Sequence, residues 1–254
     1  MPVIYDLNGQ VAFTQGTVGA LGRPMALGLA KAGAHVAVVD IDAAGAEKLA
    51  AEVRNQGVRS LAVKADITDA AQVQAAVDRV ATEFGRIDIL LNCAGNIRRK
   101  STLEMTPEEW DNVMDVNLRS AWLCCRAVAP IMMRQKKGCI VNMSSNAGLH
   151  GNGHGYSAYG PAKAGIHLLT KNLAVEWGQQ GIRVNALVPG FTNTSFNTDI
   201  LSNQDFVKGL LARLPLGCYL PPEGMVGPFL FLCSEAAQYV TGHMLHVDCG
   251  LNAR

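Results

Sequence analysis

The stretch Gln15-Gly16-Thr17-Val18-Gly19-Ala20-Leu21-Gly22-Arg23 decides the fold, because it joins an apolar strand to a helix. Residues 11–13 before it are typical of a short buried strand. From about Leu21 to Ala32 apolar residues recur at the helical period. Glycines let a backbone approach phosphate closely, and a helix N-terminus attracts anions. An ordinary loop would explain the glycines alone, but strand, turn and helix together predict a nucleotide site.

A second strand, His35–Val39, ends at Asp40, near the place where an acid meets the ribose hydroxyls of a bound dinucleotide. Ile41 follows and is expected beside the same cofactor. A carboxylate here repels a 2′-phosphate, so NAD is expected rather than NADP. Asp42 is interpreted as a helix cap or a solvated residue.

The alternation of strand and helix continues along the chain. Helices are predicted over 47–56 and 73–84, and strands over 60–64 and 87–91. This order predicts an α/β protein with a parallel, doubly wound sheet. Asp66 follows the third strand and either meets the adenine, with Ile67 beside it, or caps the helix that begins near Asp69. The sequence leaves these two readings even.

Length and composition limit the possible functions. The 254 residues are enough for one large domain, expected to span residues 1–254. The net charge of +1 gives no indication of a nucleic-acid or membrane partner. No signal peptide or apolar membrane span is recognised, so a cytoplasmic location is expected. The seven cysteines contain no Cys-x-x-Cys pair and are interpreted as free thiols, with no metal site.

These motifs resemble the short-chain dehydrogenase/reductase family of the classical type over essentially the whole chain. The family pattern Thr-Gly-x-x-x-(Ala/Gly)-x-Gly is matched by Gly16, Ala20 and Gly22, with Gln15 in place of threonine. The resemblance implies a single-domain Rossmann fold, with a seven-stranded parallel sheet and helices on both faces. It also implies cofactor contacts in the first half of the chain at Gly16, Thr17, Ala20, Leu21, Gly22, Asp40, Ile41, Asp66, Ile67, Asn92, Ala94 and Gly95.

Two further positions depart from the family pattern. Cys93 replaces asparagine within Asn92-Cys93-Ala94-Gly95, and Cys249 replaces a usual glycine after the last strand. The sequence does not give the consequence of either change.

Tyr159 and Lys163 supply an acid/base pair. Residues four apart lie on one face of a helix, and Pro161 is tolerated in a first helical turn. The pKa of a phenol is near 10, and a nearby ammonium is expected to lower it. The pair is therefore interpreted as a proton-transfer device. The family resemblance completes the catalytic set with Ser145, the second serine after the fifth strand, and with Asn117.

Asn117 lies in a helix expected to start at Thr106, with Pro107 first and Glu109 closing a capping box. A buried amide inside an apolar helix needs partners, which a kink with a bound water would provide. The resemblance instead gives Asn117 a proton-relay water held with Lys163. The two interpretations are compatible.

The segment that follows the sixth strand is Pro189-Gly190-Phe191-Thr192-Asn193-Thr194, which matches the family's Pro-Gly-x-x-x-Thr. The resemblance implies that Pro189, Gly190, Thr192 and Thr194, together with Tyr159 and Lys163, hold the nicotinamide end. Residues from about 195 to 215 are expected to form a substrate lid. The family usually forms homotetramers, so a homotetramer is expected here.

The loop from Asn146 to Gly155 is polar and glycine-rich and is expected to border substrate. A metal site at its two histidines is disfavoured, because its glycines argue against the helix that their spacing would need. Arg98-Arg99-Lys100 is either a solvated basic loop or a recognition site for an anionic substrate. Candidate substrate residues are Arg98, Ser145, Asn146, His150, Asn152, His154 and Tyr159.

Together these features predict an NAD-dependent oxidoreductase that interconverts a secondary alcohol and a ketone, with a small-molecule substrate. The segments 96–100 and 249–254 look similar to sugar-acid dehydrogenases of the family, so a sugar, polyol or sugar acid is expected. One alternative is a reductase of β-keto thioesters on a carrier protein, which usually prefers NADPH. The other is a non-catalytic dinucleotide-binding regulatory protein, against which the complete catalytic set argues.

Overall fold

Seven parallel strands form one sheet within the residues that the computed structural model describes, namely 5–153, 155–192, 194 and 204–253. The order across the sheet is β3-β2-β1-β4-β5-β6-β7. The chain changes direction across the sheet between β1 and β4, where a crevice at the carboxyl ends is expected. The strands are β1 Val11–Gln15, β2 His35–Asp40, β3 Ser60–Lys64, β4 Ile89–Asn92, β5 Gly138–Met143, β6 Ile182–Pro189 and β7 Met244–Val247.

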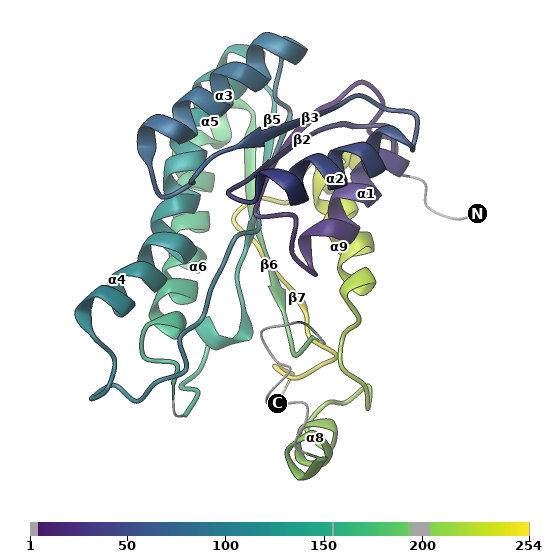
Figure 1. Cartoon of the computed structure of the whole chain (residues 1–254). Coiled ribbons are helices and arrows are strands. Elements are labelled where there is room, and N and C mark those ends of the chain that lie inside the picture. The colour runs from purple at the N-terminus through teal and green to yellow at the C-terminus, as the bar shows by residue number, and fades with distance from the viewer. Residues whose placement is uncertain (1–4, 154, 193, 195–203, 254) are drawn as a thin grey trace.

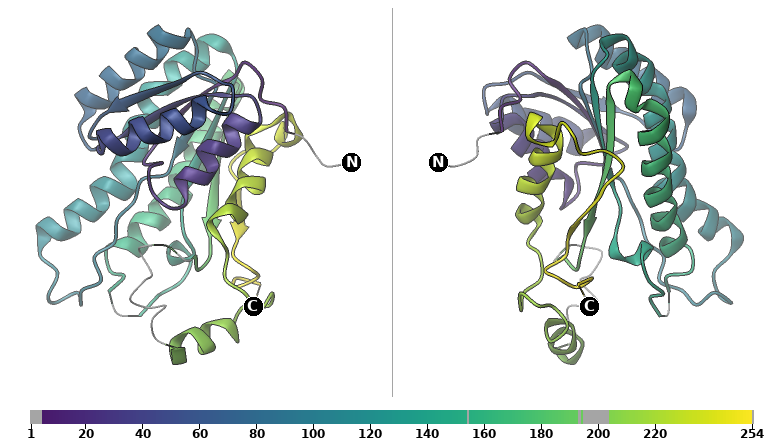
Figure 2. Two further views of the ribbon diagram at one scale, coloured as in Figure 1. Left: turned by 45° about the vertical axis from the view of Figure 1, so that its right-hand side comes forward. Right: turned by 180° about the vertical axis from the view of Figure 1, so that it is seen from behind.

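Helices cover both faces of this sheet, as predicted (Figure 1). Helices α1, α2 and α9 lie on one face, and α3, α5 and α6 lie on the other; Figure 2 shows the same layers from two further sides. The α-helices are α1 Gly22–Lys31, α2 Ala43–Arg54, α3 Ala70–Phe84, α4 Pro107–Met114, α5 Ser120–Gln135, α6 Tyr159–Trp177, α8 Gln204–Leu211 and α9 Val226–Cys233. Shorter turns are η1 Asp115–Arg119, η2 Asn146–Gly148, η3 Gly178–Gln180, η4 Pro222–Met225 and η5 Glu235–Ala237.

The hydrophobic core has two halves, one on each face of the sheet. On one side Met25, Leu29 and Phe229 pack against the strands. On the other side Val77 and Leu123 do so. Because both faces are covered, β1 and β4 are buried along their whole length, which is the usual condition of a parallel sheet.

Side-chain caps fix where several helices begin. Asp42 accepts a hydrogen bond from the backbone N–H of Gly45, so the predicted cap is confirmed and α2 begins at residue 43 rather than 47. Asp69 caps α3. Thr106 and Glu109 form the predicted capping box of α4.

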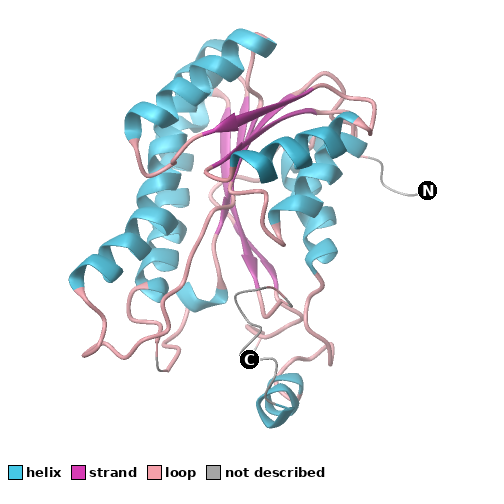
Figure 3. Ribbon diagram, in the orientation of Figure 1, coloured by secondary structure: helices cyan, strands magenta, loops and turns pink. Residues whose placement is uncertain are grey.

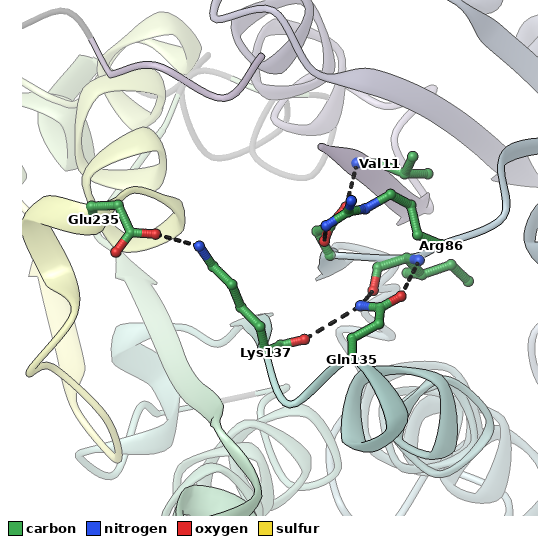
Figure 4. A network of polar contacts seen from close by, with 7 residues as sticks. Val11, Arg86, Gln135, Lys137 and Glu235 are labelled. Carbon is green, nitrogen blue, oxygen red and sulfur yellow. Dashed lines mark hydrogen bonds and ion pairs between the residues drawn. The ribbon is translucent and has the colours of Figure 1, made fainter. Parts of the chain in front are cut away.

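The two ends of the parallel strands carry different features. The end where the strands begin is called the amino edge, and the end where they finish is called the carboxyl edge. At the amino edge, buried Asp88 accepts hydrogen bonds from Arg86 and from the backbone N–H of Val11 (Figure 4). The Gln135 side chain forms two hydrogen bonds with the backbone of Ile87, just before β4, and Lys137 forms an ion pair with Glu235. At the opposite end the loops gather near α8 (Figure 3), and these loops hold the predicted site residues.

Candidate active site

A cavity opens at the carboxyl edge of the sheet, where most of the predicted site segments converge. Its wall is formed by the glycine turn, the end of β4, the loop after β4, the end of β5, the start of α6 and the segment after β6. These segments come from both halves of the chain. The structure therefore brings the glycine turn together with Ser145, Tyr159 and Lys163 at one cavity, whereas Asp40 and Asn117 are not among its lining residues.

The glycine turn packs so closely that its glycines have structural reasons. Gly16 has φ 68°, and a Cβ placed on it would lie 2.4 Å from the Cα of Ala94. A Cβ on Gly22 would lie 2.3 Å from the Cα of Thr17. Gly19 faces open space instead. Together with Ala20 and Leu21, these glycines line the cavity, whereas Thr17 is buried behind them.

Gln15 replaces the family threonine, and its longer side chain connects the glycine turn to the neighbouring strand β4. Its side-chain amide donates to Asn92 Oδ1 at 3.1 Å and accepts from the backbone N–H of Ala94 at 3.1 Å. Asn92 donates to Asn142 at 2.8 Å, and Asn142 donates to Thr170 at 3.0 Å. This amide row crosses β1, β4 and β5 to reach α6. The side chain of Asn92, predicted to bind cofactor, is thus occupied within the sheet.

Asp40 lies where an adenosine ribose would be recognised. Its carboxylate accepts from the backbone N–H of Val18 in the glycine turn at 3.4 Å and from that of Asp42 at 3.1 Å. Ile41 beside it is 63% exposed. The residues present therefore fit a nicotinamide dinucleotide, with open glycine backbone for its phosphates and a carboxylate beside them.

Asp66 does not cap the following helix, so that reading of the sequence is wrong. Its carboxylate accepts from the backbone N–H and the hydroxyl of Thr68, while Asp69 makes the cap. The physical reason is position: Asp69 immediately precedes the first helical residue, where a side chain reaches the free N–H groups. Ile67 packs partly against the core. The adenine contact of Asp66 and Ile67 stays a prediction.

Cys93 and Gly95, at the end of β4, line the cavity floor. Burial raises the pKa of the Cys93 thiol to about 12, partly opposed by the charge of Lys163. Cys93 therefore presents a neutral thiol there.

Tyr159 and Lys163 begin α6 and face the cavity together. Lys163 Nζ is 5.6 Å from the centroid of the Tyr159 ring and donates to the backbone carbonyl of Met143 at 2.9 Å. Ser145 lies close enough to Tyr159 to lower the pKa of its phenol, and its hydroxyl accepts from the backbone N–H of Ala147 at 3.2 Å. Ser144 instead donates to the backbone carbonyl of Lys163 at 3.0 Å, which anchors the helix. The two adjacent serines thus have different partners.

The predicted lowering of the Tyr159 pKa is wrong for the protein alone. Burial, the largest cause, raises the pKa to about 12, and it outweighs the lowering by the Ser145 hydroxyl and by the charge of Arg99. Burial also lowers the pKa of Lys163, to about 8. Burial disfavours both charged forms, although Lys163 is buried and Tyr159 is only partly buried at the cavity wall.

Asn117 lies in η1, a π-helical turn between α4 and α5, rather than in one continuous helix. Its Nδ2 is within 3.0 Å of both the backbone carbonyl and the Oδ1 of Asn96, and donates to the carbonyl of Val113. Its Oδ1 is buried and has no donor among the described residues. A Cβ on Gly95 would lie 2.8 Å from this oxygen and 3.6 Å from Lys163 Nζ. Asn117 and Lys163 therefore approach the same point.

Arg99, rather than Arg98, lies on the cavity wall. Its guanidinium lies 5.6 Å from the centroid of the Tyr156 ring and donates to the Tyr156 hydroxyl at 3.4 Å. Its backbone packs on Gly155, where a Cβ would lie 2.9 Å from the Cα of Arg99. The spacing in the sequence could not distinguish two adjacent arginines.

The substrate loop contributes Asn146 and Asn152 to the cavity wall. Asn152 donates to the backbone carbonyl of His150 at 2.8 Å. His150 bonds Asn252 from the end of the chain. The predicted residue His154 lies outside the described residues. Within the described residues no cluster of three or more His, Cys, Asp or Glu side chains is placed to hold a metal.

The segment after β6 lines the cavity with its predicted residues Pro189, Gly190, Thr192 and Thr194. The predicted site residues do not include the apolar lining residues Ile97, Met143, Ala147, Phe191 and Leu251. Leu251 lies in the ending that resembles sugar-acid dehydrogenases, which was the available signal. No helix of the described part of the chain has the length and apolar character to cross a membrane.

Comparisons with known proteins agree with this geometry. A family model described as enoyl-(acyl carrier protein) reductase matches residues 16–252. The 3-oxoacyl-[acyl-carrier-protein] reductase FabG of Staphylococcus aureus is 38% identical, covering 94% of this chain and 97% of the relative. The 2-dehydro-3-deoxy-D-gluconate 5-dehydrogenase of Dickeya dadantii is 36% identical, covering 98% of each.

A solved structure gives the same fold. The gluconate 5-dehydrogenase of Burkholderia cenocepacia, in complex with NADP and tartrate, is 32% identical with a TM-score of 0.94, covering 99% of this chain and 98% of that chain. Together with the nucleotide turn and the Tyr159–Lys163 pair, these matches show that the chain belongs to the short-chain dehydrogenase/reductase family of oxidoreductases.

Proposed function

We propose that this enzyme is an NAD-dependent dehydrogenase that oxidises a secondary hydroxyl of a sugar acid, or reduces the corresponding ketone. The observation that carries the proposal is the position of Arg99. It lines the same cavity as Tyr159, close enough for its charge to affect the pKa of that phenol. A carboxylate bound to Arg99 would leave the hydroxylated carbons of the same molecule at Tyr159.

Tyr159, Ser145 and Lys163 would carry the proton chemistry. When bound, the oxidised nicotinamide supplies the hydride acceptor and a positive charge beside the site. Ser145, which lies close to Tyr159, would align the substrate hydroxyl oxygen. Tyr159 would take the proton from that oxygen as its phenolate forms. Lys163 and Asn117, which meet beside Gly95, would pass the proton toward solvent. For the reverse reduction Tyr159 would donate it.

NAD is proposed as the preferred dinucleotide because of Asp40. The carboxylate faces the glycine turn, so a 2′-phosphate would meet negative charge. Glycine backbone from Gly16 to Gly22 would hold the phosphates, and residues 189–194 would hold the nicotinamide end. The Burkholderia relative was solved with NADP. A ratio of kcat/KM with NAD to that with NADP above 10 is expected, and a ratio below 1 would contradict this assignment.

A second candidate is a reductase of β-keto thioesters, favoured by the identity to FabG. The two functions differ in the group that binds Arg99. A sugar acid brings a carboxylate, whereas a thioester brings a long neutral chain. Turnover of a β-keto thioester with no turnover of any sugar acid would favour the reductase.

The experiment compares Arg99→Met with its neighbour Arg98→Met, which serves as the matched control because Arg98 lies off the cavity wall. Wild-type enzyme is first assayed by NADH absorbance on gluconate, 2-dehydro-3-deoxygluconate and neutral polyols. Arg99→Met is expected to raise KM for the acidic substrate by about 10-fold or more, since a charged hydrogen bond is lost. Arg98→Met is expected to change it less than threefold. Equal effects would contradict the role of Arg99.

A homotetramer is proposed on the apolar surface of the helices. Trp122 on α5 and Leu168 and Val175 on α6 are 45%, 60% and 85% exposed. Exposed apolar patches of this kind mark interfaces. Sedimentation of the purified protein as a monomer would contradict the tetramer.

The proposed lid over 195–215 includes α8, while residues 195–203 lie outside the described part.

A further inference from the structure

Residues 248–252, here called the C-terminal arm, are hydrogen-bonded to the substrate loop more than a hundred residues earlier. Asn252 Nδ2 donates to Asn146 Oδ1 at 2.7 Å, and Asn252 Oδ1 is 2.9 Å from His150 Nε2. Asp248 Oδ2 accepts from the backbone N–H and from Nδ2 of Asn252, at 3.0 and 2.6 Å. Asn252, held by Asp248, therefore links the arm both to His150 and to Asn146, the residue that follows Ser145.

The chemistry of these groups fixes which atom donates and which accepts in each of these hydrogen bonds. An ionised carboxylate accepts hydrogen bonds and cannot donate them. The Asn252 side chain must therefore turn its Nδ2 toward Asp248, which also places Nδ2 at Asn146 and 3.5 Å from His246 Nδ1. Because Asn252 donates there, Asn146 must turn its Oδ1 toward the arm. The Asn146 Nδ2 is then the atom directed elsewhere.

This Nδ2 of Asn146 is buried, and it has no acceptor among the residues that the structure describes. A buried donor without a partner is unfavourable, and native proteins rarely keep one without a reason. Asn146 also lines the cavity, next to Ser145 in sequence. The direction set by Asp248 thus leaves a buried, unpaired donor on a residue that lines the substrate site.

We propose that Asn146 Nδ2 donates a hydrogen bond to a second hydroxyl of the substrate, next to the hydroxyl that Ser145 aligns. We further propose that Asp248 is a positioning residue that fixes this donor through Asn252. The inference deepens the proposed function and rests on it. It narrows the substrate class to acids that carry two neighbouring hydroxyls.

Gly190 supports the fixed position of the arm. A Cβ on Gly190 would lie 2.7 Å from the Cα of Asp248, so the backbone of the segment after β6 packs directly on the arm. Asp248 is itself 8% exposed and also accepts from the backbone N–H of Gly250 at 3.0 Å. Asp248 therefore has little freedom to leave its place.

The test measures tartrate and malate as competitors of sugar-acid oxidation, because these two acids differ by a single hydroxyl. In wild-type enzyme the inhibition constant of malate is expected to exceed that of tartrate by about 10-fold or more. In Asn146→Ala this ratio is expected to fall to between 1 and about 2. A wild-type ratio near 1, or an unchanged ratio in the variant, would overturn the proposal.

Asp248→Asn tests the positioning role, since it keeps the shape while removing the fixed direction. The ratio of the malate to the tartrate inhibition constant is expected to fall by about threefold. The midpoint temperature of thermal unfolding is expected to stay within a few degrees of the wild-type value. A purely structural role would weaken both acids equally and leave the ratio unchanged, which would overturn the assignment of Asp248. If the variant does not fold, Asn252→Asp is measured in its place, because it removes the donor to Asn146. Wild-type enzyme that oxidises no sugar acid would contradict the proposed function instead.

Discussion

The two edges of the sheet use buried polar groups in opposite ways. At the amino edge both carboxylate oxygens of Asp88 are paired, with Arg86 and with the backbone of Val11. At the carboxyl edge Asn117 Oδ1 and Asn146 Nδ2 are buried without partners among the described residues.

The difference separates stability from function. A fully paired polar group contributes to folding, and removing it leaves its partners unmatched. An unpaired polar group at a cavity gains its partner only from a ligand or from solvent. Substitutions at the amino edge are therefore expected to change stability, and those at the carboxyl edge to change activity. Two measurements test this contrast, and a third measures how far burial of a charged group at the carboxyl edge opposes folding.

Tyr159→Phe is expected to have the largest effect, on activity alone. The ring stays in place while the proton acceptor is lost, so kcat is expected to fall by about 1000-fold or more. The dissociation constant for NAD, measured by NADH fluorescence competition, is expected to stay within threefold. Tyr156→Phe, which stands edge-on to the same ring, is the matched control and is expected to lose less than tenfold. Unchanged turnover in Tyr159→Phe would remove its catalytic assignment.

Asp88→Ala is expected to lower the free energy of unfolding by about 2 to 3 kcal/mol, because it leaves the Val11 N–H and the Arg86 guanidinium without their acceptor. Urea unfolding at a fixed protein concentration measures the change, and kcat per folded molecule is expected to be preserved. Glu235→Ala is the control at the same edge. Its ion pair with Lys137 is 67% and 60% exposed, so a loss below about 1 kcal/mol is expected. Equal losses would contradict the comparison.

Lys163 gives an effect on stability that is seen only when the pH is changed. Burial lowers its pKa from 10.5 to about 8, so the unfolded chain binds more protons between these values. Relative to a variant without this lysine, wild-type stability is therefore expected to rise with pH across this window, and this gain is lost as pH falls through 8. Relative to Lys163→Met, the gain from pH 7.5 to 10 is expected to be roughly 2 to 3 kcal/mol. Parallel stability curves for the two proteins would show that burial does not disfavour the ammonium.

The opposite pKa direction of Tyr159 sets the upper limit of that experiment. Its pKa is raised to about 12, so its contribution is complete below pH 10 and declines above it. Burial also raises the pKa of the Cys93 thiol, so its contribution already declines within this window. The comparison with Lys163→Met, which keeps that thiol, is therefore what isolates Lys163.

The cofactor half of the molecule was predictable because its requirements are local. The glycine turn, Asp40 and the capping box of Thr106 and Glu109 each act over a few residues, so their spacing in the sequence is enough. The strand Ser60–Lys64 was predicted with the bounds that the structure has. The alternation of strands and helices was sufficient to give the sheet.

The substrate side was not predictable to the same depth, because its contacts join distant segments. Asn146 and Asn252 are 106 residues apart, and nothing in either neighbourhood indicates the other. The raised pKa of Tyr159 depends on burial, which a spacing of four residues does not reveal. Similarly, the partners of Gln15 are Asn92 at the end of β4 and Ala94 just after it, so the role of this departure from the family pattern depends on strand pairing that the sequence does not show.

The amide row from Gln15 to Thr170 also restricts how this chain can evolve. Asn92 and Asn142 each hydrogen-bond two neighbours in the row. A mutation at either one therefore leaves polar atoms on both sides without a partner. Substitutions at these positions are therefore expected to be tolerated only when the neighbouring positions of the row change at the same time. Related sequences should therefore carry correlated residues at 15, 92 and 142, and a long amide at 15 should accompany a particular set of partners rather than vary alone.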